Sequence, residues 1–262
     1  MKNFKNTNLS VRNILTFTVI VIIVLSPIFL SSVISCKILP TYQSESKAIT
    51  QDSEIDTIVK EEIKYLEGEE IMLPEPRLKS DFSLEEAMAK RRSIRDFTGK
   101  GIEIEKISQL LWAAQGITEK SSGKRTAPSA GALYPMELFI VMKDGTYHYV
   151  PEEHKLMKIS SEDLRQKLSA ACIFQQSVSD AAIDIVLTAI YERTTIKYGE
   201  RGIRYVHMEA GHVCQNIFLT SVSLGLGAVP IGAFDDSSVQ KLLNLPSHYM
   251  PLYVIPVGYP ED

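Results

Sequence analysis

Apolar and polar positions alternate along most of this chain with periods that predict both helices and strands. Residues 104–115 carry apolar side chains at helical spacing and end before Gly116, a residue type that commonly follows a helix. The apolar runs 137–143 and 146–150 flank the turn-forming pair Asp144-Gly145 and predict a β-hairpin. The same periods predict two further strands and a long helix with a small-residue face, at 183–189, 252–257 and 204–224. The pattern therefore predicts an α+β domain.

The first 36 residues follow a different pattern. A charge-free apolar run from Ile14 to Cys36 is preceded by Lys2, Lys5 and Arg12 and is long enough to cross the core of a bilayer. One interpretation is a retained transmembrane anchor. The other is a cleaved bacterial signal in which Cys36 ends a lipoprotein-like box and is lipidated. Both interpretations predict a membrane-tethered, extracytoplasmic domain.

Residues 37–80 are polar and acidic and predict a linker. The Pro74-Glu75-Pro76 stretch interrupts regular structure near its end. Apolar residues at near-helical spacing between Ile55 and Leu66 predict a short amphipathic helix that docks on the domain. Residues 81–262 remain for the folded domain itself.

Composition limits the class of protein. With 262 residues, 45% of them hydrophobic and 23% charged, the chain has enough apolar material for one sizeable core. Its formal net charge of −4 offers no electrostatic basis for nucleic-acid binding. Cys36, Cys172 and Cys214 show no metal-binding or redox-pair spacing, and His207 and His212 lie off a common helix face. We therefore predict no metal site.

Candidate chemistry begins with Arg91, Arg92 and Arg95, three guanidinium groups that follow a predicted helix capped by Ser83. Planar, permanently charged donors at this density suit a phosphate monoester. The alternative is a solvated basic helix end, which is common on protein surfaces.

Five motifs, in order along the chain, resemble those of the nitroreductase-like FMN flavoproteins and, among them, of the SagB-type (thiazole/oxazole-forming) dehydrogenases. They are Arg91-Arg92-Ser93-Ile94-Arg95-Asp96-Phe97, residues 125–135, Lys197-Tyr198-Gly199-Glu200-Arg201, residues 209–216 and residues 225–236. The resemblance runs from about residue 82 to the C-terminus and implies a mostly antiparallel sheet flanked by helices, with FMN at the interface of a homodimer. It also implies that Arg91, Arg92, Ser93 and Arg95 hold the phosphate and ribityl chain of FMN.

The loop 125–135 is where this resemblance would locate the flavin ring. Pro128 and Pro135 restrict its backbone, and small residues around Gly131 allow a planar ring to approach main-chain groups closely. The resemblance assigns Ser129 to hydrogen bonding with the ring. The alternative is an ordinary loop between a helix and a strand.

The turn 229–234 has the same chemical character. Gly232 and Ala233 expose backbone N–H groups that can stabilise negative charge on a reduced flavin. The alternative is a tight turn after a glycine-rich helix end. The sequence after Gly258 lacks the late basic residues that many nitroreductases use on the phosphate, so phosphate binding depends more heavily on the three arginines.

Lys197 and Tyr198 are the residues predicted to carry the reaction. A lysine whose pKa is lowered by burial and nearby cations can act as a base, and a tyrosine can donate or relay a proton. Because adjacent residues point in different directions, we expect at most one of them to face a substrate squarely. The alternative is an exposed lysine beside a packed tyrosine, and the resemblance is what assigns the pair to catalysis.

The resemblance implies an FMN-dependent oxidoreductase that removes a proton from an azoline ring carbon while hydride passes to the flavin. Its substrate would be a small molecule or a peptide. Two alternatives remain open. One is a nitro- or quinone-type reductase that takes electrons from a nicotinamide or a membrane donor, and the other is a flavin-binding protein without turnover.

Overall fold

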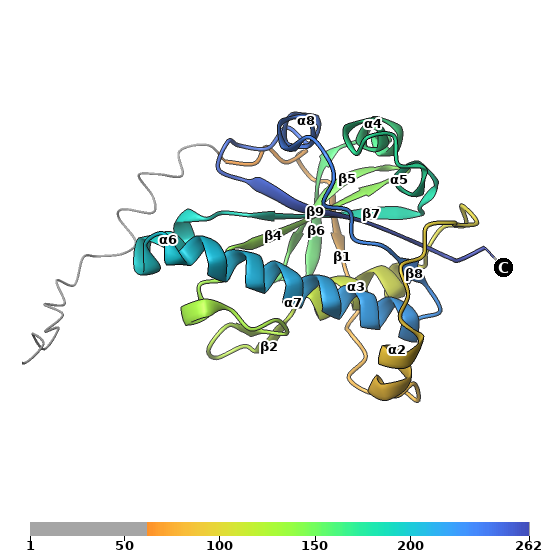
Figure 1. The fold of residues 1–262 in the computed structure, drawn as a ribbon, viewed down its shortest axis with the longest axis horizontal. Coiled ribbons are helices and arrows are strands. Elements are labelled where there is room, and N and C mark those ends of the chain that lie inside the picture. Colours follow the sequence, from red (N-terminus) through yellow and green to blue (C-terminus); the bar gives the residue numbers. More distant parts are fainter. Residues whose placement is uncertain (1–61, 262) are drawn as a thin grey trace, which may run out of the picture. The chain divides into compact units, whose positions relative to one another are not determined.

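The computed structural model describes residues 62–261 and contains a seven-stranded sheet with helices on both faces (Figure 1). The strands lie in the order β1-β6-β5-β4-β7-β9-β8, and every pair of neighbours is antiparallel. Their bounds are β1 (Glu70–Met72), β4 (Met136–Met142), β5 (Gly145–Val150), β6 (Lys155–Ser160), β7 (Ile183–Ala189), β8 (Gly227–Ala228) and β9 (Met250–Gly258). A separate hairpin joins β2 (Ile117–Glu119) to β3 (Lys124–Arg125).

Two groups of helices cover the sheet (Figure 1). On one face lie α3 (Ile104–Gln115) and α7 (Arg201–Ser223). On the other face lie α4 (Arg165–Ala171), α5 (Gln176–Asp180) and α8 (Asp236–Leu242). The remaining helices are α2 (Leu84–Lys90), the 3-10 turn η1 (Ala130–Ala132) and α6 (Glu192–Tyr198).

Strand β4 explains why both faces need cover. Leu138 and Ile140 point into the core under α3 and α7, whereas Phe139 and Val141 point into the core under α4 and α8. All four side chains are buried. Because successive residues of a strand face opposite sides, a run that is apolar on both sides belongs to a central strand. The uninterrupted apolar run in the sequence therefore reflects burial on two faces.

The structure confirms the α+β class and the mostly antiparallel sheet. The predicted helix at 104–115 has these bounds, and the predicted hairpin turns at Asp144. The long helix begins earlier than predicted, at Arg201. Ser83 caps α2 as expected, because its hydroxyl accepts the backbone N–H of Glu86 at 3.0 Å.

Residues 62–80 depart from the predicted polar linker. Residues 62–66 are not helical, so the predicted amphipathic helix is wrong for this part of its range. Backbone hydrogen bonding to β6 explains the difference: the N–H of Leu66 donates to the carbonyl oxygen of Lys158 at 2.9 Å, and β1 pairs with β6. Ile63 is buried in the core on the α4 side of the sheet. The folded unit therefore begins before residue 81.

The predicted anchor or lipoprotein signal at residues 1–36, and the linker up to residue 61, lie outside the described residues. Among residues 62–261, no helix is both long and apolar enough to span a bilayer.

Candidate functional site

The three predicted phosphate-binding arginines follow helix α2. Arg91 Cζ lies 5.2 Å from the centre of the Phe218 ring on α7, and Arg92 donates to the carbonyl oxygens of Ala89 and Arg91 at 3.1 and 2.7 Å. Arg95 lines a cavity of about 350 Å³ whose wall also contains carboxylates. None of the three forms an ion pair with a carboxylate inside residues 62–261. The charges of Arg91 and Arg92 are therefore available to an anionic ligand.

The arginine stretch lies beside the segment that leads into the turn 229–234. Ser93 forms a parallel bridge with Ala228, and the N–H of Ile94 donates to the carbonyl oxygen of Ala228 at 3.0 Å. A Cβ atom at Gly227 would meet Ile94 at 2.7 Å, so this close approach requires a glycine. Two motifs that are far apart in the sequence are thereby joined.

Gly232 and Ala233 lie exposed in this turn. Their backbone N–H groups donate to no acceptor within the described part of the chain. Gln175 connects the turn to the arginines, because it lines the Arg95 cavity and its Nε2 donates to the carbonyl oxygen of Ala233 at 3.3 Å. The two exposed N–H groups can therefore donate to a ligand.

Lys197 and Tyr198 converge on the loop predicted to hold the flavin ring. Gly131 in that loop has φ +65°, and a Cβ atom there would lie 3.1 Å from Lys197 Nζ and 2.8 Å from Tyr198 Oη. Both polar groups therefore reach the same point beside Gly131. The long lysine side chain makes this possible, because it bends back until Nζ lies 5.5 Å from the centre of the Tyr198 ring.

The two residues of the pair differ in burial. Lys197 is exposed within the single chain. Tyr198 is half-buried, and its ring meets the Tyr205 ring edge-on with centroids 5.1 Å apart. Ser129, in the facing loop, accepts the backbone N–H of Tyr134 on its hydroxyl oxygen at 2.9 Å. The Ser129 hydroxyl also faces the Glu209 carboxyl group, and this interaction acts to lower the pKa of Glu209.

A buried carboxyl group that was not predicted lies under this loop. Glu209 on α7 is 2% exposed. Burial raises the pKa of Glu209 to about 7, although Ser129, Gln115 and the positive charge of Arg125 act in the opposite direction. Glu209 Oε1, Gln115 Nε2 and Arg125 Nε are buried without a hydrogen-bond partner among residues 62–261. The sequence does contain a signal for it, because Glu209 interrupts the apolar spacing of Val206 and Val213.

Helix α7 lies between Arg91 and the Ser129 loop. Arg91 contacts Phe218, whereas the Ser129 loop lies beside Glu209. The nine residues between these helix positions correspond to about 13 Å along the axis and about half a turn around it. Within one chain, Arg91 and the Ser129 loop therefore lie on different sides of α7.

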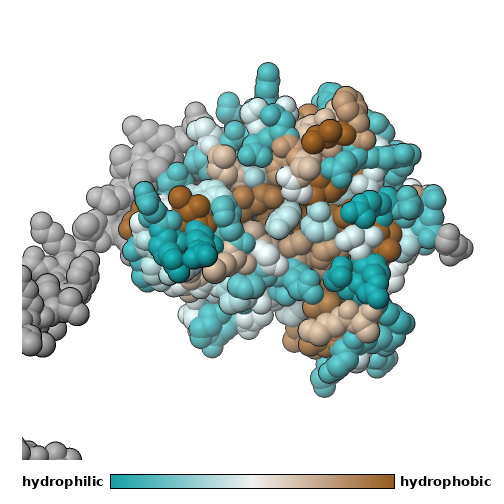
Figure 2. Space-filling model, in the orientation of Figure 1, coloured by the Kyte–Doolittle hydropathy of each residue, from teal (hydrophilic) through white to brown (hydrophobic). Residues whose placement is uncertain are grey.

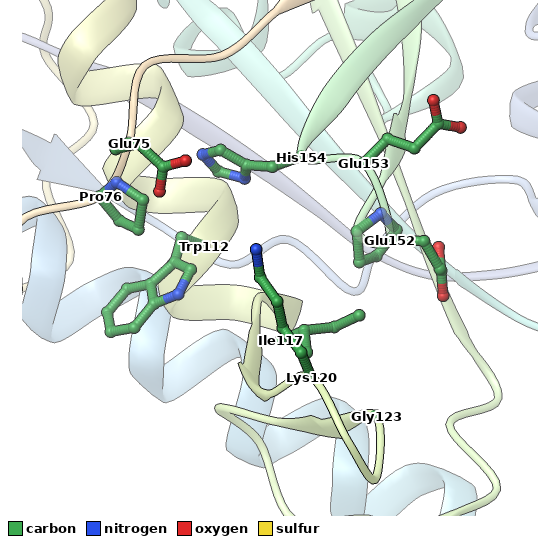
Figure 3. Close-up of a pocket in the computed structure, with 10 residues that line it drawn as sticks. Glu75, Pro76, Trp112, Ile117, Lys120, Gly123, Glu152, Glu153 and His154 are labelled. Carbon is green, nitrogen blue, oxygen red and sulfur yellow. The ribbon is translucent and has the colours of Figure 1, made fainter.

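A further cavity, of about 470 Å³, lies between the segment before α2, the end of α3 and the β5–β6 turn (Figure 3). Trp112 forms one wall, and the Glu75 carboxylate, the His154 imidazole and the Lys120 ammonium group point toward a common space (Figure 3). None of the predicted flavin-binding or catalytic residues lines this cavity. It is therefore separate from the candidate site.

The described cysteines do not form a metal or redox centre. Burial raises the pKa of the Cys172 thiol to about 12 and that of the Cys214 thiol to about 11, which disfavours the thiolate. No group of His, Cys, Asp and Glu side chains within residues 62–261 is placed to hold a metal ion.

Residues 88–259 match the Nitroreductase family. Because this match covers more than half of the chain, the protein belongs to the nitroreductase family and is a flavin-dependent oxidoreductase. The family resemblance stated from the sequence is thus confirmed.

Two relatives illustrate the range of the family. The nitroreductase-family protein MJ1384 of Methanocaldococcus jannaschii is 40% identical over 195 residues, which are 72% of this chain and 96% of that protein. The microcin B17-processing protein McbC of Escherichia coli is 31% identical over 157 residues, which are 55% of this chain and 57% of McbC. The peptide-processing branch is therefore among the relatives, as the resemblance implied.

Solved structures confirm the nitroreductase fold. A nitroreductase from Ralstonia eutropha JMP134 has a TM-score of 0.68 at 28% identity, covering 74% of this chain and 90% of that one. A chain of the Escherichia coli microcin synthetase McbBCD complex, solved with truncated pro-MccB17 bound, has a TM-score of 0.60 at 26% identity. This second match covers 80% of this chain and 82% of that chain.

Proposed function

We propose that this protein is an FMN-dependent dehydrogenase of the SagB type, acting on a small-molecule or peptide substrate. The observation that carries the proposal is the convergence of Lys197 Nζ and Tyr198 Oη at Gly131. Dehydrogenation at carbon requires a base, and a neighbouring proton donor can orient the substrate. A simple reductase needs only an open flavin face. The similarity to McbC supports the same branch.

The donor groups of the site fit FMN. Guanidinium groups without carboxylate partners suit a phosphate monoester, and backbone N–H groups without acceptors suit the negative charge of a reduced flavin. When bound, FMN supplies a two-electron acceptor for hydride. The residues proposed to hold it are Arg91, Arg92, Ser93, Arg95, Ser129, Gly232 and Ala233.

The chain's own residues have separate tasks in this proposal. Lys197 accepts the proton from the substrate carbon at Nζ, and Tyr198 donates a hydrogen bond from Oη to the substrate. Gly131 leaves the space through which a substrate approaches both groups, since a Cβ atom there would crowd them. Ser129 is held beside the proposed position of the flavin ring, because its hydroxyl oxygen accepts the N–H of Tyr134.

A nitro- or quinone-type reductase is the second candidate. It is favoured by the 40% identity to MJ1384, which extends over 96% of that protein. The exposure of Lys197 is also compatible with a flavin face that needs no base. The two candidates differ in whether the Lys197–Tyr198 pair matters for flavin reduction.

We also propose that two copies of the chain share the flavin sites as a homodimer. The separation of Arg91 from the Ser129 loop by α7 supports this arrangement, since a second chain can supply the missing half of each site. Gly211, in the middle of α7, is exposed, and a Cβ atom there would meet nothing within 4 Å. A mid-helix glycine costs about 1 kcal/mol relative to alanine, so close approach of a second helix offers a reason for it. Figure 2 shows apolar and polar side chains intermixed over the face that α7 crosses.

The proposed location is outside the cytoplasmic membrane, with residues 1–36 as the tether. The charge-free run from Ile14 to Cys36 supports it. A transmembrane anchor and a lipoprotein modified at Cys36 both satisfy this proposal.

The test of the proposed reaction uses Lys197→Ala and Tyr198→Phe, with the exposed Lys241→Ala as the control. Both test variants should keep near wild-type flavin content, because the cofactor contacts come from other residues. With a thiazoline-containing peptide as substrate, loss of the base or donor should lower the rate of flavin reduction by about 10²–10⁴-fold. Reoxidation by oxygen should change much less.

Two outcomes contradict the proposal. If both variants reduce flavin at the wild-type rate with a substrate that works, the reductase candidate replaces the dehydrogenase. If both variants lose flavin while Lys241→Ala retains it, the pair is structural.

A further inference from the structure

A chain of hydrogen bonds connects the segment before the family region to the proposed active site. Tyr65 Oη lies 2.8 Å from His148 Nδ1, and His148 Nε2 lies 2.8 Å from one carboxylate oxygen of Glu137. The other Glu137 oxygen accepts from Arg193 Nη2 at 2.6 Å. Arg193 Nη1 donates in turn to the carbonyl oxygen of Tyr134 at 3.1 Å. Four side chains thus form one continuous path.

The path ends at the two elements that carry the proposed catalytic and ring-binding groups. Arg193 stands on α6 one helical turn before Lys197, so the two residues share a side of that helix. Tyr134 lies in the loop 125–135, which is predicted to hold the flavin ring, and its N–H donates to Ser129 Oγ in the same loop at 2.9 Å. Arg193 therefore ties α6 to the loop that faces it.

The two middle members of the path, Glu137 and His148, are largely buried, whereas Tyr65 and Arg193 at its ends are more exposed. The side chains of Glu137 and His148 are 13% and 9% exposed. Burial by itself would raise the pKa of Glu137, but the hydrogen bond from His148 and the charge of Arg193 hold this pKa below its usual range. Burial, with the Glu137 charge, raises the pKa of Tyr65 to about 12. One tautomer of His148 satisfies both links, since Tyr65 can donate to Nδ1 while the Nε2–H donates to Glu137.

Tyr65 belongs to residues 63–66, called here the docked segment, which lie outside the residues that match the family. The match begins at residue 88. The Tyr65 ring stacks on His148 with centroids 6.0 Å apart and an interplanar angle of 13°. On either side of it, Ile63 is buried and the N–H of Leu66 is bonded to Lys158. The segment is thus anchored independently of the Tyr65 hydroxyl.

We propose that this docked segment helps to position the catalytic groups of the active site. Through His148 and Glu137, Tyr65 orients Arg193, and Arg193 sets the position of α6 against the flavin loop. These four are positioning residues, since they act on the reacting groups only through α6 and the loop. The inference rests on the proposed function of Lys197.

The expected effect follows from geometry. A displacement of a reacting group by about 1 Å can lower a rate by about 100-fold. Loss of the Tyr65 hydrogen bond, which is distant from the reacting groups, should lower the rate by less than this. A cavity of about 420 Å³ borders all four side chains, so water can take the place of the Tyr65 hydroxyl without disturbing the core. Tyr65→Phe is therefore a mild probe that keeps the ring and its stacking.

The matched control is Tyr147→Phe. Tyr147 lies on the same sheet, and its hydroxyl donates to Asp144 at 3.0 Å, at the hairpin turn of β4 and β5. The first measurement is backbone hydrogen exchange of the full-length protein in detergent. Tyr65→Phe should speed exchange several-fold in α6 and in residues 129–134, whereas Tyr147→Phe should leave both segments at the wild-type rate.

The second measurement is flavin reduction by substrate. Tyr65→Phe should lower kcat about tenfold, with KM and flavin content unchanged, a combination that simple destabilisation does not produce. Exchange in α6 equal to that of Tyr147→Phe would overturn the proposal. An unchanged kcat in protein whose Lys197→Ala variant is impaired would also overturn it. If Lys197→Ala is itself unimpaired, the proposed catalytic role of Lys197 is wrong. The hydrogen-exchange result alone then decides whether Tyr65 affects the position of α6.

Discussion

Replacing Glu209 by glutamine should remove a pH-dependent loss of stability. Burial raises the pKa of Glu209 from 4.5 to about 7 in the folded protein. Below pH 4.5 the Glu209 carboxyl group is protonated in both the folded and the unfolded state, so its ionisation does not change the free energy of unfolding. As pH rises toward 7, the unfolded state ionises first, so the free energy of unfolding falls. The full loss is about 3 kcal/mol, because one pKa unit corresponds to about 1.4 kcal/mol.

Urea unfolding of the flavin-free protein at about pH 4.5 and about pH 8 measures this loss. Glutamine is neutral at both pH values. The free energy of unfolding of Glu209→Gln, relative to that of the wild type, should therefore be about 3 kcal/mol higher at about pH 8 than at about pH 4.5. Any constant cost of burying the amide, about 1–3 kcal/mol, cancels in this comparison. Glu67→Gln, at an exposed position, is the control and should show no gain. A difference between Glu209→Gln and wild type that is the same at both pH values would refute the reasoning.

The remaining predictions concern the cofactor, the tether and the dimer. Arg91→Ala combined with Arg95→Ala should weaken FMN binding by about 100-fold or more, since each charge-assisted contact contributes about 1.5–3 kcal/mol; protein as yellow as wild type would contradict the phosphate assignment. Cys36→Ala should abolish lipid labelling and alter the size of a lipoprotein, whereas no change indicates a retained anchor; full-length protein found wholly soluble in the cytoplasm would exclude both. Gly211→Leu should shift sedimentation toward the monomer and reduce flavin content, and the exposed Gln166→Leu should do neither. An intact dimer in Gly211→Leu would remove α7 from the interface.

Much of the fold could be predicted because its helices and strands depend on residues that are close together in the sequence. The helix 104–115 and the hairpin at Asp144 depend on side-chain period and turn chemistry within a few residues. The helix at 55–66 was the wrong inference for residues 62–66, where near-helical spacing belonged to a segment that pairs with β6. Edge pairing with a distant strand overrode the local period there.

The candidate site was predictable in its parts but not in its arrangement. The motifs pointed to Arg91, Ser129 and Lys197, yet nothing in them indicated that α7 separates Arg91 from the Ser129 loop. The motifs likewise did not indicate that the flexible Lys197 side chain lies over the Tyr198 ring.

The sequence by itself determined the α+β class, the family and the residue types available for a flavin, because periodicity and motif order are properties of the chain. Only the tertiary structure decided which of those residues meet. The burial of Glu209 beneath Ser129 requires α7 to pack against the loop. The path from Tyr65 to Arg193 requires the order of the strands to bring residues 65, 137 and 148 to one place. Such contacts depend on packing between distant segments, and no local period records them.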